Sequence, residues 1–255
     1  MSKKSKPVPT VDELISTIKH SSLPTVVLEG DDDVIALRCM EEEYYDIGLS
    51  VLPAGGRNNV LKIFDRRSEF ATQAVAFVAD KDTWVMSSIP DQYVDDDLIF
   101  TSGYSIENDV YVDGDVERLM SLPERQRFKA ELEVFARWYA LAVNRCLNNT
   151  GEEYKLHPNA ILDDAVEREK RMALEADEVY PEELRESLLG NYRQIIRGKS
   201  LMALLIRHLS YRGRVVHHNH LQIIEQVGCQ RGPLIDRIFG GVATIINRKI
   251  NEGIA

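Results

Sequence analysis

Short apolar runs alternate with amphipathic segments over the first half of the chain. The runs are rich in Val, Ile, Leu and Ala and end in turn-forming or acidic residues, which is typical of buried strands. Apolar residues at helical spacing, such as Val34, Leu37 and Met40, separate them. We predict strands at residues 24–30, 47–52, 74–79 and 98–100, and helices at residues 11–18, after Asp31 and at 58–64.

Strands that alternate with helices at intervals of about 25 residues are typical of βαβ units. Right-handed crossovers make such strands parallel and align their carboxyl ends along one edge of the sheet, where these sheets bind ligands. The predicted fold class is therefore α/β with a parallel sheet, formed by residues 23–115. Residues 1–22 are expected to form a leader and a short helix.

The second half of the chain has a helical pattern. Apolar residues recur at spacings of three and four from residue 124 to 147, which predicts a long amphipathic helix with Trp138 and Tyr139 in the core. Further helices are expected at about 160–176, 181–197, 199–210, 217–227 and 233–251. Residues 116–255 are thus expected to form a helical domain whose C-terminal part is basic.

The charge of the chain is unevenly distributed. A net charge of −10 would argue against a nucleic-acid partner. Between Arg193 and Asn251, however, ten Lys and Arg residues face two acids, so this segment carries +8 and the remainder −18. The asymmetry favours a basic region that holds phosphates and an acidic region that holds cations. The alternative is a solvated helical face without a ligand.

The cysteines and the apolar runs indicate a cytoplasmic protein. Three cysteines, Cys39, Cys146 and Cys229, lie far apart in sequence and match neither a disulfide framework nor a zinc site. No apolar run approaches the ~20 residues of a membrane-spanning helix. The polar N-terminal residues also lack the apolar stretch of a secretory signal.

Acidic residues follow the predicted strands. Glu29 ends the first strand, Asp33 comes four residues later, and Asp80 and Asp82 follow the third strand. Parallel strands would bring these carboxylates to the same edge of the sheet. Oxygen ligands without His or Cys suit Mg²⁺ or Mn²⁺, and two such ions can promote phosphodiester cleavage.

Three further features are candidates for the same site. Ser105 and Glu107 follow the fourth strand, and the serine can orient a ligand, bond to a carboxylate or merely cap a helix. Lys199 begins an apolar helix, and it either neutralises a phosphate or is an ordinary exposed lysine. The turn at residues 55–58, Gly-Gly-Arg-Asn, can receive a phosphate on its backbone N–H groups or be a plain turn.

A basic and aromatic cluster lies in the C-terminal part. Arg207, Tyr211, Arg212 and Arg214 fall within eight residues of sequence. Guanidinium groups bind a phosphate backbone and a tyrosine can stack on a base, so the cluster is a candidate nucleic-acid-binding surface. An acidic surface on a partner protein would suit it equally well.

The order of these residues resembles the Toprim domain over about residues 24–110. That family has a glutamate at the end of a first strand and an Asp-X-Asp after a later one, here Val27-Leu28-Glu29-Gly30 and Phe77-Val78-Ala79-Asp80-Lys81-Asp82. Asp33, the Ser105-Ile106-Glu107 segment and Lys199 are similar to the additional residues of the OLD (overcoming-lysogenization-defect) type of Toprim nuclease.

The chain lacks the Gly-X-X-X-X-Gly-Lys-Ser/Thr motif of the ATPase that OLD proteins usually carry. It is therefore most similar to the standalone Toprim effectors of the AriB type, which belong to PARIS anti-phage systems.

This resemblance implies a Mg²⁺-dependent or Mn²⁺-dependent nuclease with two ions. Glu29, Asp33, Asp80, Asp82 and Glu107 would hold the metal, with Glu29 also acting as general base or acid. Lys199 would stabilise charge on the phosphate and Ser105 would orient the ligands.

The AriB resemblance further implies a toxic effector that cleaves tRNA as a homodimer after release from a separate, AriA-like ATPase subunit. The alternatives are a housekeeping Toprim enzyme of RNA processing or DNA repair and replication, or a non-catalytic Toprim-derived module that binds a partner or nucleotide.

Overall fold

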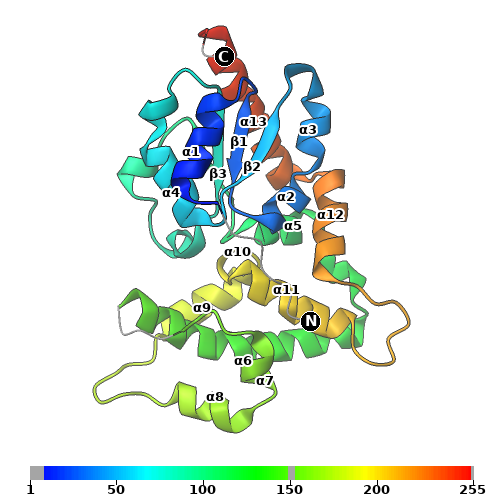
Figure 1. Ribbon diagram of the computed structural model, residues 1–255. Helices are drawn as coiled ribbons and strands as arrows, with labels where there is room; N and C mark the ends of the chain where they lie inside the picture. The colour runs from blue at the N-terminus through cyan, green and yellow to red at the C-terminus, as the bar shows by residue number, and fades with distance from the viewer. Residues whose placement is uncertain (1–8, 149–152, 254–255) are drawn as a thin grey trace, which may run out of the picture. The chain divides into compact units, whose positions relative to one another are not determined.

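The chain forms two compact units in the computed structural model, which describes residues 9–148 and 153–253. Unit 1 comprises Met1–Asp113 together with Ile224–Ala255, and unit 2 comprises Gly114–Ile223. Unit 1 contains the sheet, and the described residues of unit 2 form helices and the turns that connect them, with no strand (Figure 1).

The elements of unit 1 alternate between strand and helix. The strands are β1 (Thr25–Leu28), β2 (Ser50–Pro53), β3 (Val75–Ala79) and β4 (Leu98–Phe100). The α-helices are α1 (Val11–His20), α2 (Asp31–Ala36), α3 (Cys39–Glu43), α4 (Arg57–Asp65), α5 (Ile106–Asp113), the part of α12 (His220–Gln230) from Ile224 onward, and α13 (Pro233–Asn251). Short 3-10 helices span Tyr45–Ile47, Arg67–Phe70, Asp82–Met86 and Asp91–Tyr93.

The four strands form a parallel sheet in the order β2-β1-β3-β4. Val27 pairs with Leu52 on one side and Phe77 on the other, and Phe77 pairs with Leu98. This confirms the predicted α/β class with a parallel sheet. The second strand begins later than predicted because residues up to Ile47 form a 3-10 turn that ends at Gly48, whose φ of 67° is left-handed.

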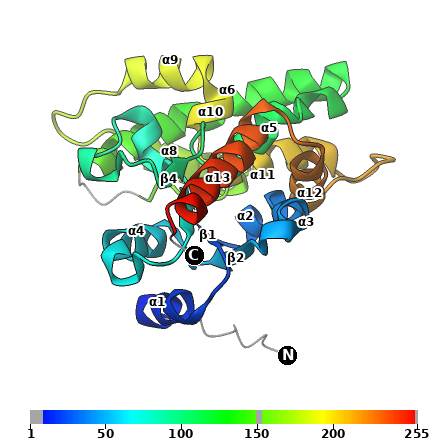
Figure 2. The same ribbon diagram turned by 90° about the horizontal axis from the view of Figure 1, so that it is seen from above.

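Helices cover both faces of this sheet (Figure 2). Alternate strand residues such as Val27, Phe77 and Phe100 pack with the apolar faces of α1 and α4. On the other side α13 contacts β3, β4 and α5. Strands buried on both faces read as continuous apolar runs, which is why they were visible in the sequence.

The C-terminal segment differs from the prediction. Residues 116–255 were expected to form one helical domain, but residues from Ile224 onward pack with the sheet. Ile238, Val242 and Ile246 of α13 are fully buried. The sheet has a second apolar face that must be covered. An amphipathic helix late in the chain can cover it as well as a helix nearby in sequence can.

Unit 2 is built around the long helix that the sequence predicts. Trp138 and Tyr139 are completely buried on it, and so are Leu201, Leu204, Leu205 and Leu209 of a facing helix. The helices are α6 (Leu122–Leu147), α7 (Pro158–Leu162), α8 (Ala165–Met172), α9 (Glu182–Gly190), α10 (Tyr192–Ile195) and α11 (Gly198–Leu209), preceded by a 3-10 turn at Val116–Leu119.

Within unit 2, α6 contacts α7, α8, α9 and α11. None of the described helices of either unit is long and apolar enough to cross a membrane.

Candidate functional site

Two acidic segments meet at the carboxyl edge of the sheet in unit 1. Because β1 and β3 are adjacent and parallel, Glu29 and Asp80 leave the sheet side by side. The backbone N–H of Asp80 donates to Glu29 Oε1 at 2.8 Å. The backbone oxygen of Glu29 accepts from the N–H of Gly56 at 2.8 Å, which ties the turn before α4 to the same place.

Asp33 lies in the first turn of α2 and is buried, with 5% of its surface exposed. Its Oδ2 accepts from the N–H of Gly30 at 3.1 Å and so caps the helix. Its Oδ1 is buried and has no hydrogen-bond partner among the described residues. The helix cap accounts for one carboxylate oxygen, and the second is a buried acceptor that a bound cation or a further donor would satisfy.

The start of α5 contributes the third acidic segment. The N–H of Ile106 donates to Asp80 Oδ1 at 2.9 Å. The buried Ser105 hydroxyl donates to the carboxylate of Glu107, and its contact with Asn108 Oδ1 is 3.0 Å. The carboxylate bond is one of the roles predicted for Ser105. The residue also immediately precedes α5, where its backbone oxygen accepts from the N–H of Asn108.

Asp82 contacts a cation that comes from the glycine turn. Arg57 Nη1 lies 3.1 Å from Asp82 Oδ2, and the guanidinium stacks 3.5 Å from the centre of the Trp84 ring. The backbone φ of Asp82 is 49°, a left-handed conformation that few non-glycine residues adopt and that recurs at functional sites. The Asp-X-Asp segment is thus a turn with a defined conformation, held by side-chain contacts, rather than a solvated loop.

The acid edge, as we call it, consists of five carboxylates: Glu29, Asp33, Asp80, Asp82 and Glu107. They influence one another electrostatically. Burial and the neighbouring charges of Asp82 and Glu107 raise the pKa of Glu29 to about 7, despite the hydrogen bond from Asp80. Burial raises the pKa of Asp33 and Asp80 above the ordinary range, and repulsion among the carboxylates adds to it.

The chemistry of this edge fits a hard divalent cation. Its donors are all oxygens, as Mg²⁺ and Mn²⁺ prefer, and a cation would offset the repulsion that raises the pKa values. Among the described residues no three acids, histidines or cysteines are already gathered into a ligand set. In Glu29, Asp33 and Asp80 one carboxylate oxygen accepts from a backbone N–H, which orients the carboxylate and leaves its second oxygen for a metal.

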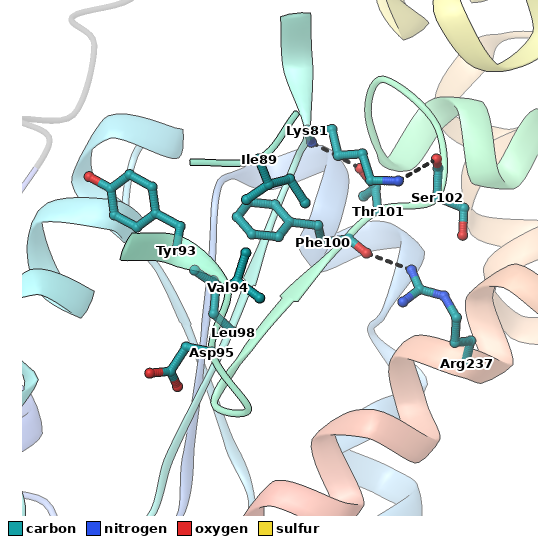
Figure 3. Close-up of a pocket in the computed structure, with 10 residues that line it drawn as sticks. All are labelled: Lys81, Ile89, Tyr93, Val94, Asp95, Leu98, Phe100, Thr101, Ser102 and Arg237. Carbon is teal, nitrogen blue, oxygen red and sulfur yellow. Dashed lines mark hydrogen bonds between the residues drawn. The ribbon is translucent and has the colours of Figure 1, made fainter. Parts of the chain in front are cut away.

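A groove of about 460 Å³ runs beside β4, next to the Asp-X-Asp turn. Lys81 and Arg237 lie at one end of it, where their side chains donate to the backbone oxygens of Ser102 and Phe100 (Figure 3). Burial lowers the pKa of Lys81, and the nearby Arg237 lowers it further. Ile89, Tyr93 and Phe100 make the remainder of the lining largely apolar.

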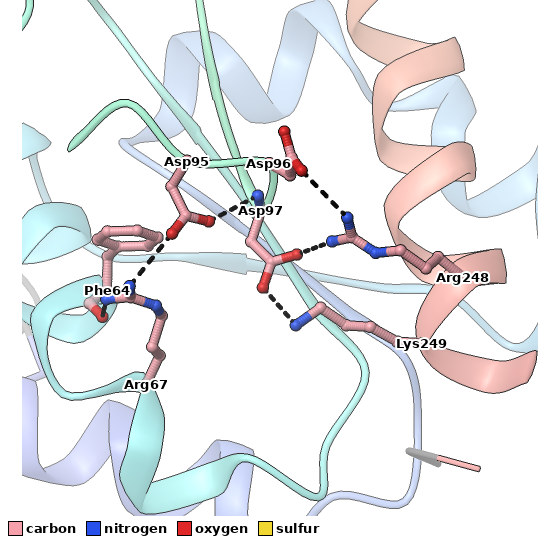
Figure 4. A network of polar contacts seen from close by, with 7 residues as sticks. All are labelled: Phe64, Arg67, Asp95, Asp96, Asp97, Arg248 and Lys249. Carbon is pink, nitrogen blue, oxygen red and sulfur yellow. Dashed lines mark hydrogen bonds and ion pairs between the residues drawn. The ribbon is translucent and has the colours of Figure 1, made fainter. Parts of the chain in front are cut away.

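The other acidic stretch of unit 1, Asp95-Asp96-Asp97, has a structural role. Arg67 Nη2 lies 3.1 Å from Asp95 Oδ2, and Lys249 Nζ lies 2.6 Å from Asp97 Oδ2 (Figure 4). Arg248 also bonds to Asp97. The pairs of Asp97 fasten the end of α13 to the segment before β4, and the pair of Asp95 fastens that segment to the 3-10 helix at Arg67–Phe70.

Lys199 and the basic cluster belong to unit 2. Lys199 is an exposed residue in the first turn of α11, and its role with the acid edge stays a prediction. Arg207 pairs with Glu131 at 2.8 Å and Asp163 at 2.6 Å.

Arg214 pairs with Glu124 at 3.0 Å and donates to the backbone oxygen of Leu119. Two of the three arginines of the predicted nucleic-acid-binding cluster are therefore neutralised within unit 2. Tyr211 and Arg212 remain exposed, and Arg127 lies 5.7 Å from the Tyr211 ring centre.

Ion pairs inside each unit also account for part of the charge asymmetry. In unit 1, Arg231 pairs with Glu43 at 2.6 Å. In unit 2, Arg193 pairs with Glu117 at 2.9 Å. The basic C-terminal segment thus neutralises acids from earlier in the chain, and its charge alone is a weak argument for a phosphate partner.

Sequence reasoning missed two cations and a buried acid near the edge. The turn at residues 55–58 predicts a role for its backbone N–H groups but none for the Arg57 side chain, and the Asp-X-Asp pattern predicts none for Lys81, which lies between its two acids. Asp109 is fully buried and accepts from the N–H groups of Ser102 and Gly103 at 2.8 Å each. Its position one helical turn after Ser105 was the available signal.

No protein-family model matches the chain. A search of curated proteins finds no match either.

Proposed function

We propose that unit 1 is a Toprim-like, metal-dependent nuclease of the OLD type and that the acid edge holds its cations. The observation that carries the proposal is the convergence of carboxylates from the ends of β1 and β3 and from α2 and α5. Burial and repulsion by neighbouring carboxylates raise the pKa values of three of them, Glu29, Asp33 and Asp80. Perturbed acids clustered at the carboxyl edge of a parallel sheet are typical of functional sites. The resemblance to Toprim nucleases supplies the reaction.

The residues of the edge have distinct proposed roles. Asp33, Asp80, Asp82 and Glu107 would hold Mg²⁺ or Mn²⁺ together with Glu29. When bound, two such ions stabilise the negative charge of a phosphodiester under attack by water. A carboxyl group with a pKa of about 7 is half protonated at neutral pH, so Glu29 is suited to transfer a proton to or from the reacting oxygens.

Cations in unit 1 provide the proposed grip on the substrate. Arg57 lies next to Asp82 and can contact a phosphate without leaving the edge. Lys81 and Arg237 could bind the neighbouring phosphate in the groove beside β4, with Tyr93 and Phe100 available to the base or sugar. Lys199 of unit 2 is retained as a proposed charge-stabilising residue, and Tyr211 and Arg212 as proposed contacts to nucleic acid.

The biological role rests on the family resemblance. We propose a cytoplasmic toxic effector of bacterial anti-phage defence, resembling the AriB type of PARIS systems. In that role it would cleave tRNA as a homodimer after release from a separate AriA-like ATPase subunit. Housekeeping RNA processing, DNA repair or replication, and non-catalytic binding are the competing functions.

Incubation of the purified chain with tRNA, other RNA and DNA tests the activity. With Mg²⁺ the wild type should cleave tRNA, and Glu29→Gln and Asp80→Asn should lose at least about 100-fold in rate, as expected on removal of a general acid–base or a metal ligand. Asp96→Asn is the matched control, because Asp96 is a nearby exposed aspartate whose contact with Arg248 is 3.8 Å. Lys199→Ala tests the residue of unit 2 in the same assay.

The results separate the candidate functions. Cleavage of tRNA, together with host toxicity that both acid-edge variants abolish, supports the effector. Cleavage of DNA alone supports repair or replication. Equal cleavage by the wild type and both variants, or undiminished cleavage in a chelator, would contradict the metal-dependent mechanism. Metal binding without cleavage of any substrate supports a binding module.

A further inference from the structure

Two of the three cysteines meet on unit 1. Cys39 begins α3 and Cys229 lies near the end of α12, 190 residues later, yet their Sγ atoms are 3.0 Å apart. Both are free thiols, Cys39 half-buried and Cys229 exposed. The sequence separation gave no reason to expect a pair, but α3 and α12 lie side by side (Figure 1 and Figure 2).

The approach of the two helices is held by close packing and an ion pair. Gly228, beside Cys229, lies so near the end of α2 that a Cβ atom there would be 2.2 Å from the backbone oxygen of Ala36. Arg38, beside Cys39, pairs with Glu225 of α12 at 3.0 Å. Gly228 therefore holds α12 against the end of α2, and the Arg38–Glu225 pair joins α12 to the residue that precedes α3.

The surroundings distinguish the two thiols chemically. Arg38 Nε donates to Cys229 Sγ at 3.3 Å. Hydrogen bonds from Cys39 and Arg38 lower the pKa of Cys229, whereas the same contact raises the pKa of Cys39. An exposed thiol that is hydrogen-bonded to a guanidinium and adjacent to a second thiol has the features of an oxidant-sensitive cysteine.

We propose that Cys39 and Cys229 form a reversible oxidation site for hydroperoxides and that their disulfide fastens α12 to α3. The Cys229 thiolate attacks a peroxide oxygen, so that an S–O bond forms, the O–O bond breaks and the departing oxygen takes a proton. Cys39 then attacks the resulting sulfenic acid, forming the S–S bond and releasing the hydroxyl group as water with the Cys39 proton. With hydrogen peroxide, two thiols lose two electrons and two protons in total, and two waters form.

The distance suits this reaction. The sulfur atoms are about 1 Å farther apart than in a disulfide, whose bond is about 2 Å long, so side-chain movement alone can close the gap. A disulfide made on demand is also the kind found in reducing compartments, where such bonds are transient or serve as sensors. The site requires only the packing of unit 1 and does not depend on the proposed nuclease activity.

Peptide mapping of the full chain after hydrogen peroxide tests the proposal. In the wild type and in Cys146→Ser, the peptides containing Cys39 and Cys229 should become joined, and dithiothreitol should separate them. In Cys39→Ser, dimedone should trap a sulfenic acid on Cys229. In Cys229→Ser, Cys39 should react with dimedone no more than Cys146 does.

Two further measurements test the geometry and the consequence. Arg38→Ala should slow peroxide oxidation of Cys229 about threefold or more, because the thiolate loses its guanidinium donor, and Arg38→Lys should recover part of the rate. Amide hydrogen exchange over residues 224–230 should be slower in the oxidised than in the reduced wild type.

Oxidation of wild-type Cys39 and Cys229 to separate sulfinic acids without cross-linking would overturn the proposal, whatever the folding of the variants. So would cross-linking that occurs only between molecules. Unchanged hydrogen exchange in the cross-linked protein would overturn the fastening of α12.

Discussion

The inward-facing carboxylates of unit 2 and those of the acid edge in unit 1 are held in opposite ways. In unit 2, hydrogen bonds from Ser121 and Arg214 lower the pKa of Glu124 to about 2, and hydrogen bonds from Arg145 and Glu175 do the same for Glu178. At the acid edge, burial and like charges raise the pKa of Glu29 to about 7. Ionised acidic residues therefore stabilise the fold of unit 2 and destabilise that of unit 1 at the acid edge.

The difference indicates what each group of acids does. A carboxylate that is bonded to an arginine holds elements together, and ionisation favours the folded state. Carboxylates crowded together oppose folding when they are ionised, unless a cation joins them. The acid edge thus destabilises the fold in the way expected of a ligand-binding site. The paired acids of unit 2 stabilise the fold, as expected of residues with a structural role.

The largest expected effect comes from removing a cation from unit 2. Arg145 donates to both carboxylate oxygens of Glu178 and to the backbone oxygens of Arg171 and Ala173. Arg145→Ala should lower the free energy of unfolding by about 3 kcal/mol, because the half-buried Glu178 carboxylate loses its arginine and keeps only the N–H of Glu175, and two carbonyls lose a donor. Denaturation in urea, followed by the fluorescence of Trp138 in a Trp84→Phe background, measures unit 2 by itself.

The matched control for that change is Arg185→Ala. Arg185 also pairs with a glutamate, Glu182, but the pair lies within one helix turn and Glu182 is about half exposed, so the loss should stay below about 0.5 kcal/mol. Equal losses from the two variants would show that the paired acids of unit 2 do not act as a scaffold.

The second prediction concerns pH in the presence of a chelator. Glu29 keeps its proton in the folded state up to about pH 7 but loses it near pH 4.5 when unfolded, so stability should fall as pH rises between these values, on the order of 2 kcal/mol. For Glu124 and Glu178 the dependence of stability on pH has the opposite sign. Their contribution is complete above about pH 4.5 and is lost as pH falls toward about 2.

Stability should therefore be greatest near pH 4.5. Its decrease at higher pH (the upper limb) and its decrease at lower pH (the lower limb) come from different groups of acids. Glu29→Gln should reduce the slope of the upper limb, to which Asp33 and Asp80 also contribute. Glu178→Gln should reduce the slope of the lower limb, which Glu124 shares, and urea titrations across the pH range measure both changes. A wild-type stability that increases steadily from pH 4.5 to 7 would contradict the strain assigned to the acid edge.

The third prediction applies the same chemical change to both groups. Asp33→Asn keeps the acceptor for Gly30 and removes a buried carboxyl group whose ionisation the folded state opposes, so unit 1 should gain about 1 kcal/mol at neutral pH without metal. Glu124→Gln weakens the bond to Arg214, so unit 2 should lose about 1 kcal/mol. Thermal unfolding measures both shifts, and shifts of the same sign would erase the contrast between the units.

The sequence predicted the parts of this contrast that depend on local pattern. Buried parallel strands are continuous apolar runs, so the strand ends carrying Glu29 and Asp80 could be located. Asp33 and Glu107 were candidates because of their positions after the first and fourth strands, and the family resemblance added their metal-binding role. The structure puts them among the same interacting carboxylates. Core residues such as Trp138 followed from helical spacing.

What the sequence did not predict depends on tertiary contacts. The packing of α13 on the sheet was missed because an amphipathic stripe is the same whichever apolar surface covers it. The pairing of Arg207 and Arg214 with acids was missed for a similar reason, since a cation's partner is set by the fold rather than by its neighbours in sequence. The same reasoning explains why Arg57 was not assigned to Asp82.

The smallest expected effect tests the comparison inside a single acidic stretch. Asp97 contacts both Arg248 and Lys249, and its side chain is 16% exposed, whereas that of Asp96 is 94% exposed. Asp97→Asn should lower the free energy of unfolding of unit 1 by about 0.5 to 1 kcal/mol, and Asp96→Asn should change it by less than about 0.3 kcal/mol. Trp84 fluorescence in a Trp138→Phe background reports on unit 1. A gain in stability from Asp97→Asn would place Asp97 with the strained acids of the edge, because only a carboxylate that lacks adequate pairing stabilises the fold when it loses its charge.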